Sequence, residues 1–357
     1  MRIAFDAFWW LDGPPSGRNV VKSLVDAWIR STPDDVTIVV PATARATIER
    51  ELATEDSRCH VISYPKLHRN HAVAVATASP LAAGFDWLIT QNFAPIRRRG
   101  NVATFVHDAM FVDHPEWFGG AERAYLSGMR RLLRGSNVVW TSSRTEAGRI
   151  ERVWPELRGR TEPIGLAPSA GLSSISAPIE PSSERPYILA VGRVNVRKNL
   201  GRLIEAYTSA PDLMENADLV VAGPPDNDQQ LAAARVPEGG SIRFTGYVSD
   251  AELAGLYAGA QVFVFPSLDE GFGMPLVEAR MFGAPIIASD ISVFRELGVA
   301  DDYFDPRSVA DIARSLRRFV LTPRAAPRSS SRVLGWEDVV GTARDSLVGV
   351  ASERSVR

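Results

Sequence analysis

The 357-residue sequence contains a single cysteine, Cys59, and no apolar run of about 18 residues. One cysteine excludes an intramolecular disulfide and a cysteine-based zinc cluster, and it fits a reducing compartment. Without a long apolar run, no segment is expected to cross a bilayer as a helix. The formal net charge of −2 argues against a dedicated nucleic-acid-binding protein. Met1–Asp6 reaches an acid too early for a signal peptide, so a cytoplasmic protein is expected.

The composition is that of a globular protein, with 45% apolar and 23% charged residues. The length favours two compact domains, and short apolar runs alternate with amphipathic helical stretches, as in parallel α/β sheets. A proline- and serine-rich stretch without regular periodicity is the predicted linker, at 166–186. We therefore predict an N-terminal domain at 1–165, a second domain at 187–330 and a C-terminal helix at 331–357 that packs back on the first domain.

Apolar runs place the strands of both domains. In the first domain they lie at 2–7, 36–40, 60–63, 87–90, 102–106 and 138–141, and in the second at 187–191, 219–222, 242–244, 262–265 and 285–288. In doubly wound sheets, ligands bind beyond the carboxyl ends of the strands. The loops that follow these strands are therefore where site residues are expected.

The most informative stretch is residues 266–285, directly after a predicted strand. Its loop carries Glu270 and two glycines, Gly271 and Gly273, before a helix with an early proline and a second acid, Glu278, expected in the first turn. Glycines allow close approach of the backbone to a ligand, and free N–H groups at a helix N-terminus favour an anion. Local chemistry alone leaves two interpretations open, an ordinary strand-to-helix turn or a phosphate site flanked by two acids.

The string from Glu270 to Glu278, with seven residues between the acids, resembles the signature of retaining GT-B glycosyltransferases of family 4, the glycosyl transferases group 1. The resemblance implies two Rossmann-like doubly wound α/β domains that face each other across a cleft. It implies that Glu270 holds hydroxyls of the donor sugar and that Glu278 binds the ribose. The donor contacts that it implies between these acids are Gly271, Phe272, Gly273, Met274 and Leu276.

A second segment follows the predicted strand 187–191. Arg193 and Lys198 offer a planar fork and a point charge, which suit a diphosphate, although a solvated basic loop explains them as well. The Gly-Arg and Lys-Asn pairs in this segment resemble the diphosphate-binding segment of the family. This resemblance implies that Arg193 and Lys198 bind the pyrophosphate, whereas Arg197 is expected to be a neutral surface residue.

A Gly-Tyr-Val-Ser turn after the predicted strand 242–244 resembles the turn whose backbone contacts the nucleobase in the family. By that resemblance Tyr247 and Val248 flank the base. Ser249 or Asp250 is expected to cap the next helix, which is compatible with this role.

In the first half, His107 follows a predicted strand. A lone histidine is more often structural, but the His107-Asp108 pair resembles the cleft histidine of the family, which implies that His107 contacts the donor sugar near the reacting carbon. Asp108 and His114 are weaker candidates. The loop that joins the first strand to the first helix resembles a family loop that reaches the donor phosphate, and this implies a donor contact for Gly17.

Two further patterns are weighed against plainer explanations. Residues 226–228 form an Asp-x-Asp string, the metal motif of another glycosyltransferase fold, but they follow two prolines and predict a turn. No metal or other cofactor is therefore expected. The arginine clusters at 97–99 and 130–134 predict solvated faces, with peripheral contact to an anionic inner membrane face as the alternative.

Together these patterns predict a retaining hexosyltransferase that uses a nucleotide-diphosphate sugar and a glycan or lipid-linked saccharide acceptor, as in cell-surface polysaccharide synthesis. Its predicted catalytic residues are Glu270, His107, Arg193 and Lys198. Residues 107–118 resemble a loop of mannosyltransferases, which favours GDP-mannose over dTDP-rhamnose and UDP-sugars.

Proteins of other classes fit less well. The two glutamates disfavour an epimerase of the same fold. The absence of Gly-x-Gly-x-x-Gly after the first strand disfavours a Rossmann dehydrogenase. A non-catalytic nucleotide-sugar-binding protein is the alternative of another class.

Overall fold

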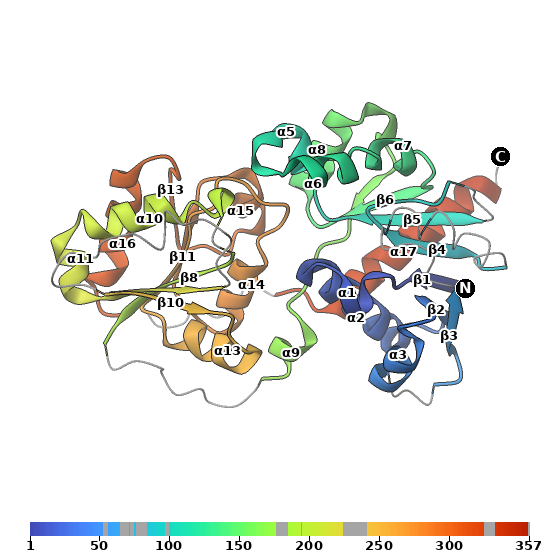
Figure 1. Ribbon diagram of the computed structural model, residues 1–357, viewed down its shortest axis with the longest axis horizontal. Helices are drawn as coiled ribbons and strands as arrows, with labels where there is room; N and C mark the ends of the chain where they lie inside the picture. The colour runs from blue at the N-terminus through green and yellow to red at the C-terminus, as the bar shows by residue number, and fades with distance from the viewer. Residues whose placement is uncertain are drawn as a thin grey trace. The chain divides into compact units, whose positions relative to one another are not determined.

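The computed structural model describes the chain except residues 53–55, 65–70, 72–74, 76–83, 97–99, 176–184, 194, 224–240, 325–332 and 356–357. The chain divides into two compact units. Unit 1 contains Met1–Ala167 and Leu334–Arg357, and unit 2 contains Pro168–Val333 (Figure 1). Of the predicted linker, residues 176–184 lie outside the described residues.

Unit 1 is built on a parallel sheet, sheet A, in the order β3-β2-β1-β4-β5-β6-β7. Its strands are β1 (Arg2–Asp6), β2 (Asp35–Pro41), β3 (Cys59–Tyr64), β4 (Trp87–Gln91), β5 (Asn101–Val106), β6 (Val138–Thr141) and β7 (Thr161–Pro163). Its helices are α1 (Trp9–Asp12), α2 (Pro15–Ser31), α3 (Arg45–Leu52), α5 (Met110–Asp113), α6 (Gly120–Leu126), α7 (Met129–Leu133), α8 (Arg144–Val153) and α17 (Trp336–Ser355). The short helices η2 (Pro115–Trp117) and η3 (Pro155–Leu157) complete the elements of this unit that we describe.

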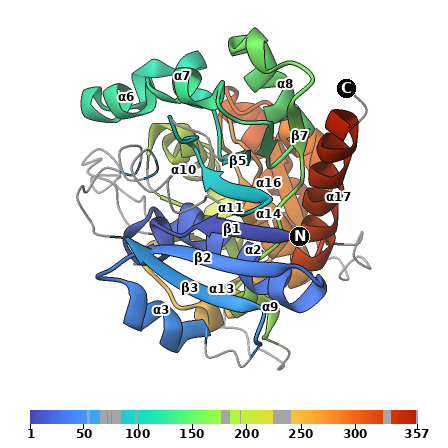
Figure 2. The same cartoon turned by 90° about the vertical axis from the view of Figure 1, so that its right-hand side faces the viewer.

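The last helix, α17, packs against α2 and β6 of unit 1 (Figure 2). Arg344 reaches Asp34 at 2.9 Å, and Asp34 also binds the N-terminal amine of Met1 at 2.8 Å. The indole N–H of Trp140 on β6 donates to Ser346 Oγ at 2.8 Å. Residues from both ends of the chain thus stabilise one sheet.

Unit 2 is built on a second parallel sheet, sheet B, in the order β10-β9-β8-β11-β12-β13. Its strands are β8 (Tyr187–Val191), β9 (Asp218–Ala222), β10 (Ile242–Gly246), β11 (Val262–Phe265), β12 (Ile286–Ser289) and β13 (Asp302–Phe304). Its helices are α9 (Ala170–Ser173), η4 (Val196–Lys198), α10 (Leu200–Thr208), α11 (Pro211–Asn216), α13 (Asp250–Gly259), α14 (Met274–Met281), α15 (Ser292–Leu297) and α16 (Val309–Val320).

Both faces of sheet B are covered, which explains why its strands are continuous apolar runs rather than alternating ones. On one face, Val262 and Val264 pack with residues of α10, α11 and α16, and on the other, Phe263 and Phe265 pack with residues of α13, α14 and α15 (Figure 1). The carboxyl ends of the strands remain as the edge where loops carry polar residues.

The predicted α/β class is confirmed, and each predicted strand is present with its ends shifted by at most two residues. Two strands at sheet edges, β7 and β13, escaped prediction because each has three residues and includes a charged one. The predicted loop between β1 and the first long helix is wrong in part: α1 intervenes, and α2 already begins at Pro15. Within the described residues, no helix combines the length and apolar character that crossing a membrane requires.

Candidate functional site

A buried ion cluster lies at the carboxyl edge of sheet B, in the loop between β11 and α14. Glu270 is 6% exposed, and its Oε1 accepts from Lys198 Nζ at 2.6 Å and from Ser267 Oγ at 2.8 Å. Its Oε2 accepts from the Arg197 guanidinium at 2.7 Å. Three donors therefore bond the two oxygens of one carboxylate.

Local structure brings the two basic residues to this acid. Asn195 caps η4 by accepting the backbone N–H of Lys198 at 3.1 Å, and the N–H of Leu268 donates to Arg197 O at 2.9 Å. Asn199 adopts a left-handed conformation (φ 55°), and its amide donates to Pro266 O at 3.0 Å. The segment after β8 is thereby fixed to the loop after β11.

These contacts correct one expectation and refine another. Arg197 is not a neutral surface residue, because it is ion-paired with a buried acid. Lys198, expected to bind the pyrophosphate, and Glu270, expected to hold the donor sugar, are in direct contact at 2.6 Å. Sequence analysis missed the pairing because the partners are more than 70 residues apart.

Burial disfavours the charged forms of both Glu270 and Lys198, and the ion pair between them offsets part of this effect. Burial alone would raise the pKa of Glu270, but Lys198 and Arg197 hold that pKa below its usual value. For Lys198, burial lowers the pKa despite the nearby charge of Glu270. A basic group with weakened hydration near the carboxyl edge of a sheet suits the binding of an anion.

Backbone geometry at this edge requires glycine at two positions. Gly192, at the end of β8, has φ 143°, and a Cβ there would lie 3.1 Å from Cε of Lys198. Gly273, which precedes α14, has φ 115°, and its Cβ would lie 2.9 Å from the ring of Phe294. A side chain at either position would strain the backbone or displace a neighbour.

The N-terminus of α14 differs in detail from the prediction. Pro275 has no N–H, and the N–H of Leu276 donates to Gly273 O at 2.9 Å, so these two residues offer no free backbone donor to an anion. The side chains of Phe272 and Leu276 are buried, which leaves only their backbones for a ligand contact.

Glu278 is the fifth residue of α14, so its expected place in the first turn is wrong. Its Oε2 accepts from the hydroxyl of the buried Tyr257 at 3.0 Å. Burial raises the pKa of Glu278 to about 7, and the charge of Asp250 adds to this effect, whereas Tyr257 and Lys198 oppose it. The residue is therefore near its titration midpoint at neutral pH.

The other residues of unit 2 that are predicted to bind the sugar donor follow strands of the same sheet. Arg193 follows β8 and is exposed, and its guanidinium makes no hydrogen bond or ion pair to any described residue. Gly271 is buried in the loop of Glu270. Tyr247, after β10, is 85% exposed, whereas Val248 packs against the core. Since β10, β9, β8 and β11 are neighbours in that order, these loops share one edge.

The remaining expectations for unit 2 concern a cap and a metal. Ser249 caps α13 in a capping box with Glu252, which confirms that prediction. The Asp-x-Asp string at 226–228 lies outside the described residues. In the rest of the chain that the structure describes, no group of three or more His, Cys, Asp or Glu side chains is arranged to hold a metal ion.

In unit 1, His107 follows β5 and is held from two sides. Its Nε2 lies 2.7 Å from Gln91 Oε1, and its backbone N–H donates to Asn92 Oδ1 at 3.2 Å. Burial lowers the pKa of His107 to about 4, with an added effect of His71. The ring is therefore neutral at pH 7, and Nε2 carries the proton that Gln91 accepts.

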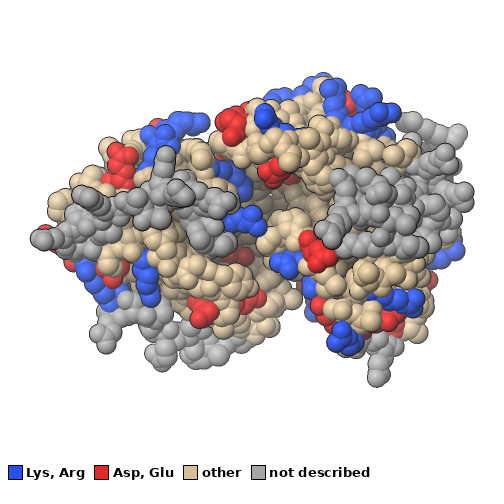
Figure 3. Space-filling model, in the orientation of Figure 1, with Lys and Arg blue, Asp and Glu red and all other residues tan. Residues whose placement is uncertain are grey.

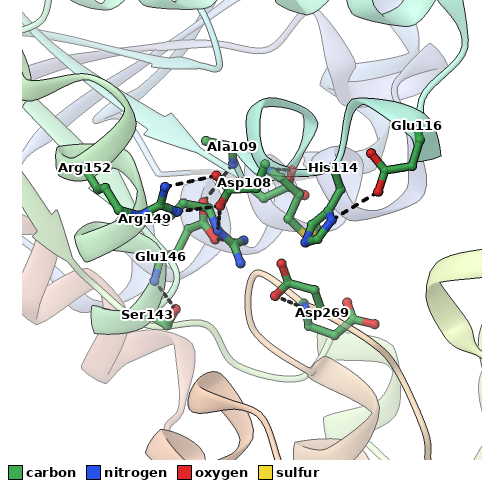
Figure 4. Close-up of polar contacts among 12 residues, drawn as sticks. Asp108, Ala109, His114, Glu116, Ser143, Glu146, Arg149, Arg152 and Asp269 are labelled. Atoms are coloured by element: carbon green, nitrogen blue, oxygen red, sulfur yellow. Dashed lines mark hydrogen bonds and ion pairs between the residues drawn. The ribbon is translucent and has the colours of Figure 1, made fainter. Parts of the chain in front are cut away.

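The loop after His107 is fixed by an acid that sequence analysis missed. Glu146 is fully buried, and its carboxylate accepts the N–H of Ala109 at 2.8 Å and contacts Arg149 at 2.7 Å (Figure 4). Ser143 caps α8 by accepting the N–H of Glu146 at 3.0 Å. From the sequence, an acid three residues after a cap serine looks like an ordinary helix start.

The weaker candidates of unit 1 have structural roles nearby. Asp108 accepts the N–H of Met110 at 3.2 Å, and the His114 ring stacks on Trp117 at 3.9 Å between centroids. His114 also contacts Glu116 at 3.3 Å (Figure 4). Gly17 lies in the first turn of α2, and a Cβ there would lie 2.3 Å from the Trp9 ring. Close packing of α1 on α2 thus explains why this residue is glycine.

The comparisons with known proteins agree with this arrangement. The profile of the family "Glycosyl transferases group 1" matches residues 174–332, nearly all of unit 2. The chain is 29% identical over 271 residues to O-antigen chain mannosyltransferase B of Escherichia coli, covering 69% of each. It is 35% identical over 139 residues to the serotype-specific mannosyltransferase WbdA of Escherichia coli, covering 37% of this chain but only 17% of that protein.

The solved structures extend the likeness of the fold to the whole chain. The Anabaena protein HepE in complex with UDP-glucose matches with a TM-score of 0.64 and 17% identity, covering 100% of both chains. This likeness establishes the GT-B fold, with its two parallel-sheet α/β domains. Residues 174–332 match a glycosyl transferases group 1 domain, and together with the relatives this match indicates that the protein is a glycosyltransferase.

Proposed function

We propose that this glycosyltransferase moves a mannosyl residue from GDP-mannose to a hydroxyl of a glycan or lipid-linked saccharide, with retention of the anomeric configuration. The observation that carries the proposal is the buried Glu270, held by Lys198 and Arg197 at the edge of sheet B where the exposed Arg193 also follows its strand. The relatives named as mannosyltransferases support the choice of sugar.

Each group at the carboxyl edge of sheet B has a part in the proposed reaction. Arg193, Lys198 and the N–H groups at the start of α14 neutralise the charge that develops on the leaving diphosphate, which is usually the largest catalytic effect. Glu270, whose orientation Arg197 and Ser267 fix, accepts hydrogen bonds from hydroxyls of the sugar. Glu278 accepts hydrogen bonds from the ribose, and the turn at Tyr247 and Val248 flanks the base.

In the proposed step, the bond between the anomeric carbon and the diphosphate oxygen breaks while a bond to the acceptor oxygen forms on the same face. The proton of the acceptor hydroxyl passes to the departing diphosphate oxygen. His107, neutral and fixed by Gln91, contacts the donor sugar near the reacting carbon. The fixed cations supply the charge stabilisation, so we propose that the reaction needs no metal, and transfer is expected to persist in EDTA.

A thermal-shift series with GDP, UDP and dTDP tests the donor. We expect the largest stabilisation with GDP, followed by transfer of mannose from GDP-mannose to a mannose oligosaccharide. A larger shift with UDP or dTDP would replace the donor by a UDP-sugar or dTDP-rhamnose. No shift with any of them, together with no release of nucleoside diphosphate, would contradict donor binding at this edge.

The place of action stays a prediction: the cytoplasm, with peripheral contact to the inner membrane face. Positive side chains gather on the surface over α6, α7 and α8 (Figure 3). Arg130 and Arg134 both pair with Glu156, at 2.9 and 3.1 Å, which reduces the net charge of the patch. The cluster at 97–99 lies outside the described residues. Sedimentation with anionic vesicles, lost on charge reversal of Arg130 and Arg134, would support membrane contact.

A further inference from the structure

Buried polar atoms without a hydrogen bond gather at one edge of unit 1. In the described part of this unit, these atoms are Tyr64 Oη, His71 Nδ1 and Thr141 Oγ1. Tyr64 is the last residue of β3, Thr141 is the last residue of β6, and His71 follows β3. All three therefore lie at or beyond the carboxyl ends of strands of sheet A. A buried polar atom without a partner costs free energy, so such atoms need an explanation.

Two of the residues that carry these atoms, His71 and Tyr64, lie near the same acid, Asp6. His71 Nε2 lies 2.6 Å from Asp6 Oδ2, and the two side chains are 2% and 6% exposed. Asp6 pairs in register with Val39, which packs with Tyr64 in one core cluster, so Asp6 and Tyr64 lie on the same face of sheet A. Burial raises the pKa of the Tyr64 hydroxyl, and the charge of Asp6 adds to this effect.

Aromatic rings line the same place. The His71 ring lies 5.1 Å from Phe8, 4.6 Å from Trp9 and 5.9 Å from Phe93, measured between ring centroids. Trp9 also lies 5.6 Å from the His107 ring. An aromatic wall with a few convergent polar atoms is the common build of a small-molecule site.

We propose that Asp6, Tyr64 and His71 form a saccharide subsite at the carboxyl edge of β1 and β3, which binds hydroxyl groups of the acceptor. This inference rests on the proposed function, because it names the part of unit 1 that holds the acceptor of that reaction. Through Trp9, the subsite adjoins His107, the residue predicted to lie beside the donor sugar.

The chemistry of the three groups selects a polyol. The contact of His71 Nε2 with Asp6 Oδ2 leaves Nδ1 as the ring nitrogen that can face a ligand. The Tyr64 hydroxyl both donates and accepts. A sugar hydroxyl can donate or accept, so neighbouring hydroxyls supply partners to both Nδ1 and Tyr64, and a sugar face packs on the aromatic rings. The negative charge of Asp6 disfavours phosphate or any other anion at this place.

The test uses the whole protein, α-linked mannotriose as the probe, and saturation-transfer difference NMR, which needs no donor and no turnover. Tyr64→Phe removes only the oxygen without a partner, so the variant is expected to fold with a melting temperature equal to or above that of the parent. Tyr207→Phe is the matched control, because the buried hydroxyl of Tyr207 in unit 2 already donates to Ala217 O at 2.8 Å. Asp6→Asn is a second variant that keeps side-chain size but removes the charge that orients His71.

We expect mannotriose signals from the parent protein and from Tyr207→Phe, and signals reduced roughly threefold to tenfold in Tyr64→Phe and Asp6→Asn. Equal signals from all four proteins, or none from the parent, would overturn the subsite. A thermal shift with GDP reports the donor edge of unit 2 separately. If GDP does not raise the melting temperature of the parent protein, the proposed donor is refuted and the saccharide result stands. If GDP raises it but mannotriose gives no signals, only the subsite is refuted.

Discussion

At the carboxyl edge of sheet B the buried charged groups bond one another, whereas at the carboxyl edge of sheet A two buried polar atoms beside Asp6 have no partner. Glu270 receives hydrogen bonds from Lys198, Arg197 and Ser267. Tyr64 Oη and His71 Nδ1 receive none. The difference follows from charge: an isolated buried ion costs far more free energy than an isolated neutral polar atom.

The comparison shows how the polar groups at each sheet edge are arranged before a ligand binds. A site for a diphosphate must hold basic residues before the anion binds, and Glu270 compensates two of them. A site for neutral hydroxyls can leave single polar atoms without a partner at a moderate cost. Arg193 is the exception at the edge of sheet B, because it is exposed and its guanidinium makes no hydrogen bond or ion pair with a described residue.

The largest effect is expected from Arg193→Ala. Removing one preorganised charge from a leaving group typically costs about 100-fold to 1,000-fold in turnover. Because Arg193 is exposed, the melting temperature should stay unchanged. Turnover is measured as release of nucleoside diphosphate from the sugar donor, with Arg158→Ala as an exposed arginine control in unit 1. Turnover of Arg193→Ala close to that of the control would remove Arg193 from the donor site.

The second prediction compares the stability lost when a buried ion pair is broken with that lost when an exposed ion pair is broken. Lys198→Met leaves Glu270 buried with less compensation, and we expect a loss on the order of 3 kcal/mol in the free energy of unfolding. The double variant Lys198→Met/Glu270→Gln should lose less than the sum of its single changes, because it leaves no buried acid. Urea unfolding measures these values.

Arg295→Met is the matched control for this pair. It breaks the half-exposed ion pair with Asp290 at 2.7 Å, and a loss below about 1 kcal/mol is expected. A loss in Lys198→Met as small as that of Arg295→Met would show that the buried cluster contributes little to folding.

A third prediction concerns pH. The pKa of Glu278 is raised from 4.5 to about 7, so the protonated form is favoured in the folded protein. If the ribose donates to the carboxylate, binding requires the ionised form. The affinity should then rise with pH up to about 7, by at most tenfold per pH unit, and level off above it.

Calorimetric titration with guanosine tests this prediction without interference from the titration of phosphate groups. Glu278→Gln should bind with an affinity that no longer varies between pH 5 and pH 8, values chosen to bracket the pKa of about 7. The same slope in the parent and in Glu278→Gln would show that another group controls the pH dependence.

The sequence predicted well what local patterns determine. Apolar runs located the strands, and the Glu270 motif and the basic segment after β8 are at one edge because parallel strands end together. It failed where two segments distant in the chain meet. Neither the pairing of Arg197 with Glu270 nor that of Asp6 with His71 leaves a mark at fixed spacing, because tertiary packing creates both. The raised pKa of Glu278 likewise depends on burial that a sequence does not show.

The smallest effect is expected at Thr141, the buried hydroxyl without a partner at the end of β6, three strands from β1. Thr141→Val keeps the shape of the side chain and removes the isolated oxygen, so a gain of about 1 kcal/mol in the free energy of unfolding is expected. Thr104→Val is the matched control on β5, because the Thr104 hydroxyl contacts those of Thr90 at 2.9 Å and Ser136 at 2.7 Å, and a loss of about 1 kcal/mol is expected there. A loss of stability in both variants would mean that Thr141 has a partner in solution, such as an ordered water, and would restrict the contrast between the two edges to the surroundings of Asp6. A more stable Thr141→Val variant that binds the saccharide acceptor more weakly would instead extend the proposed subsite along the edge of sheet A from β3 to β6. Removal of an isolated polar atom harms function only where a ligand supplies the partner of that atom.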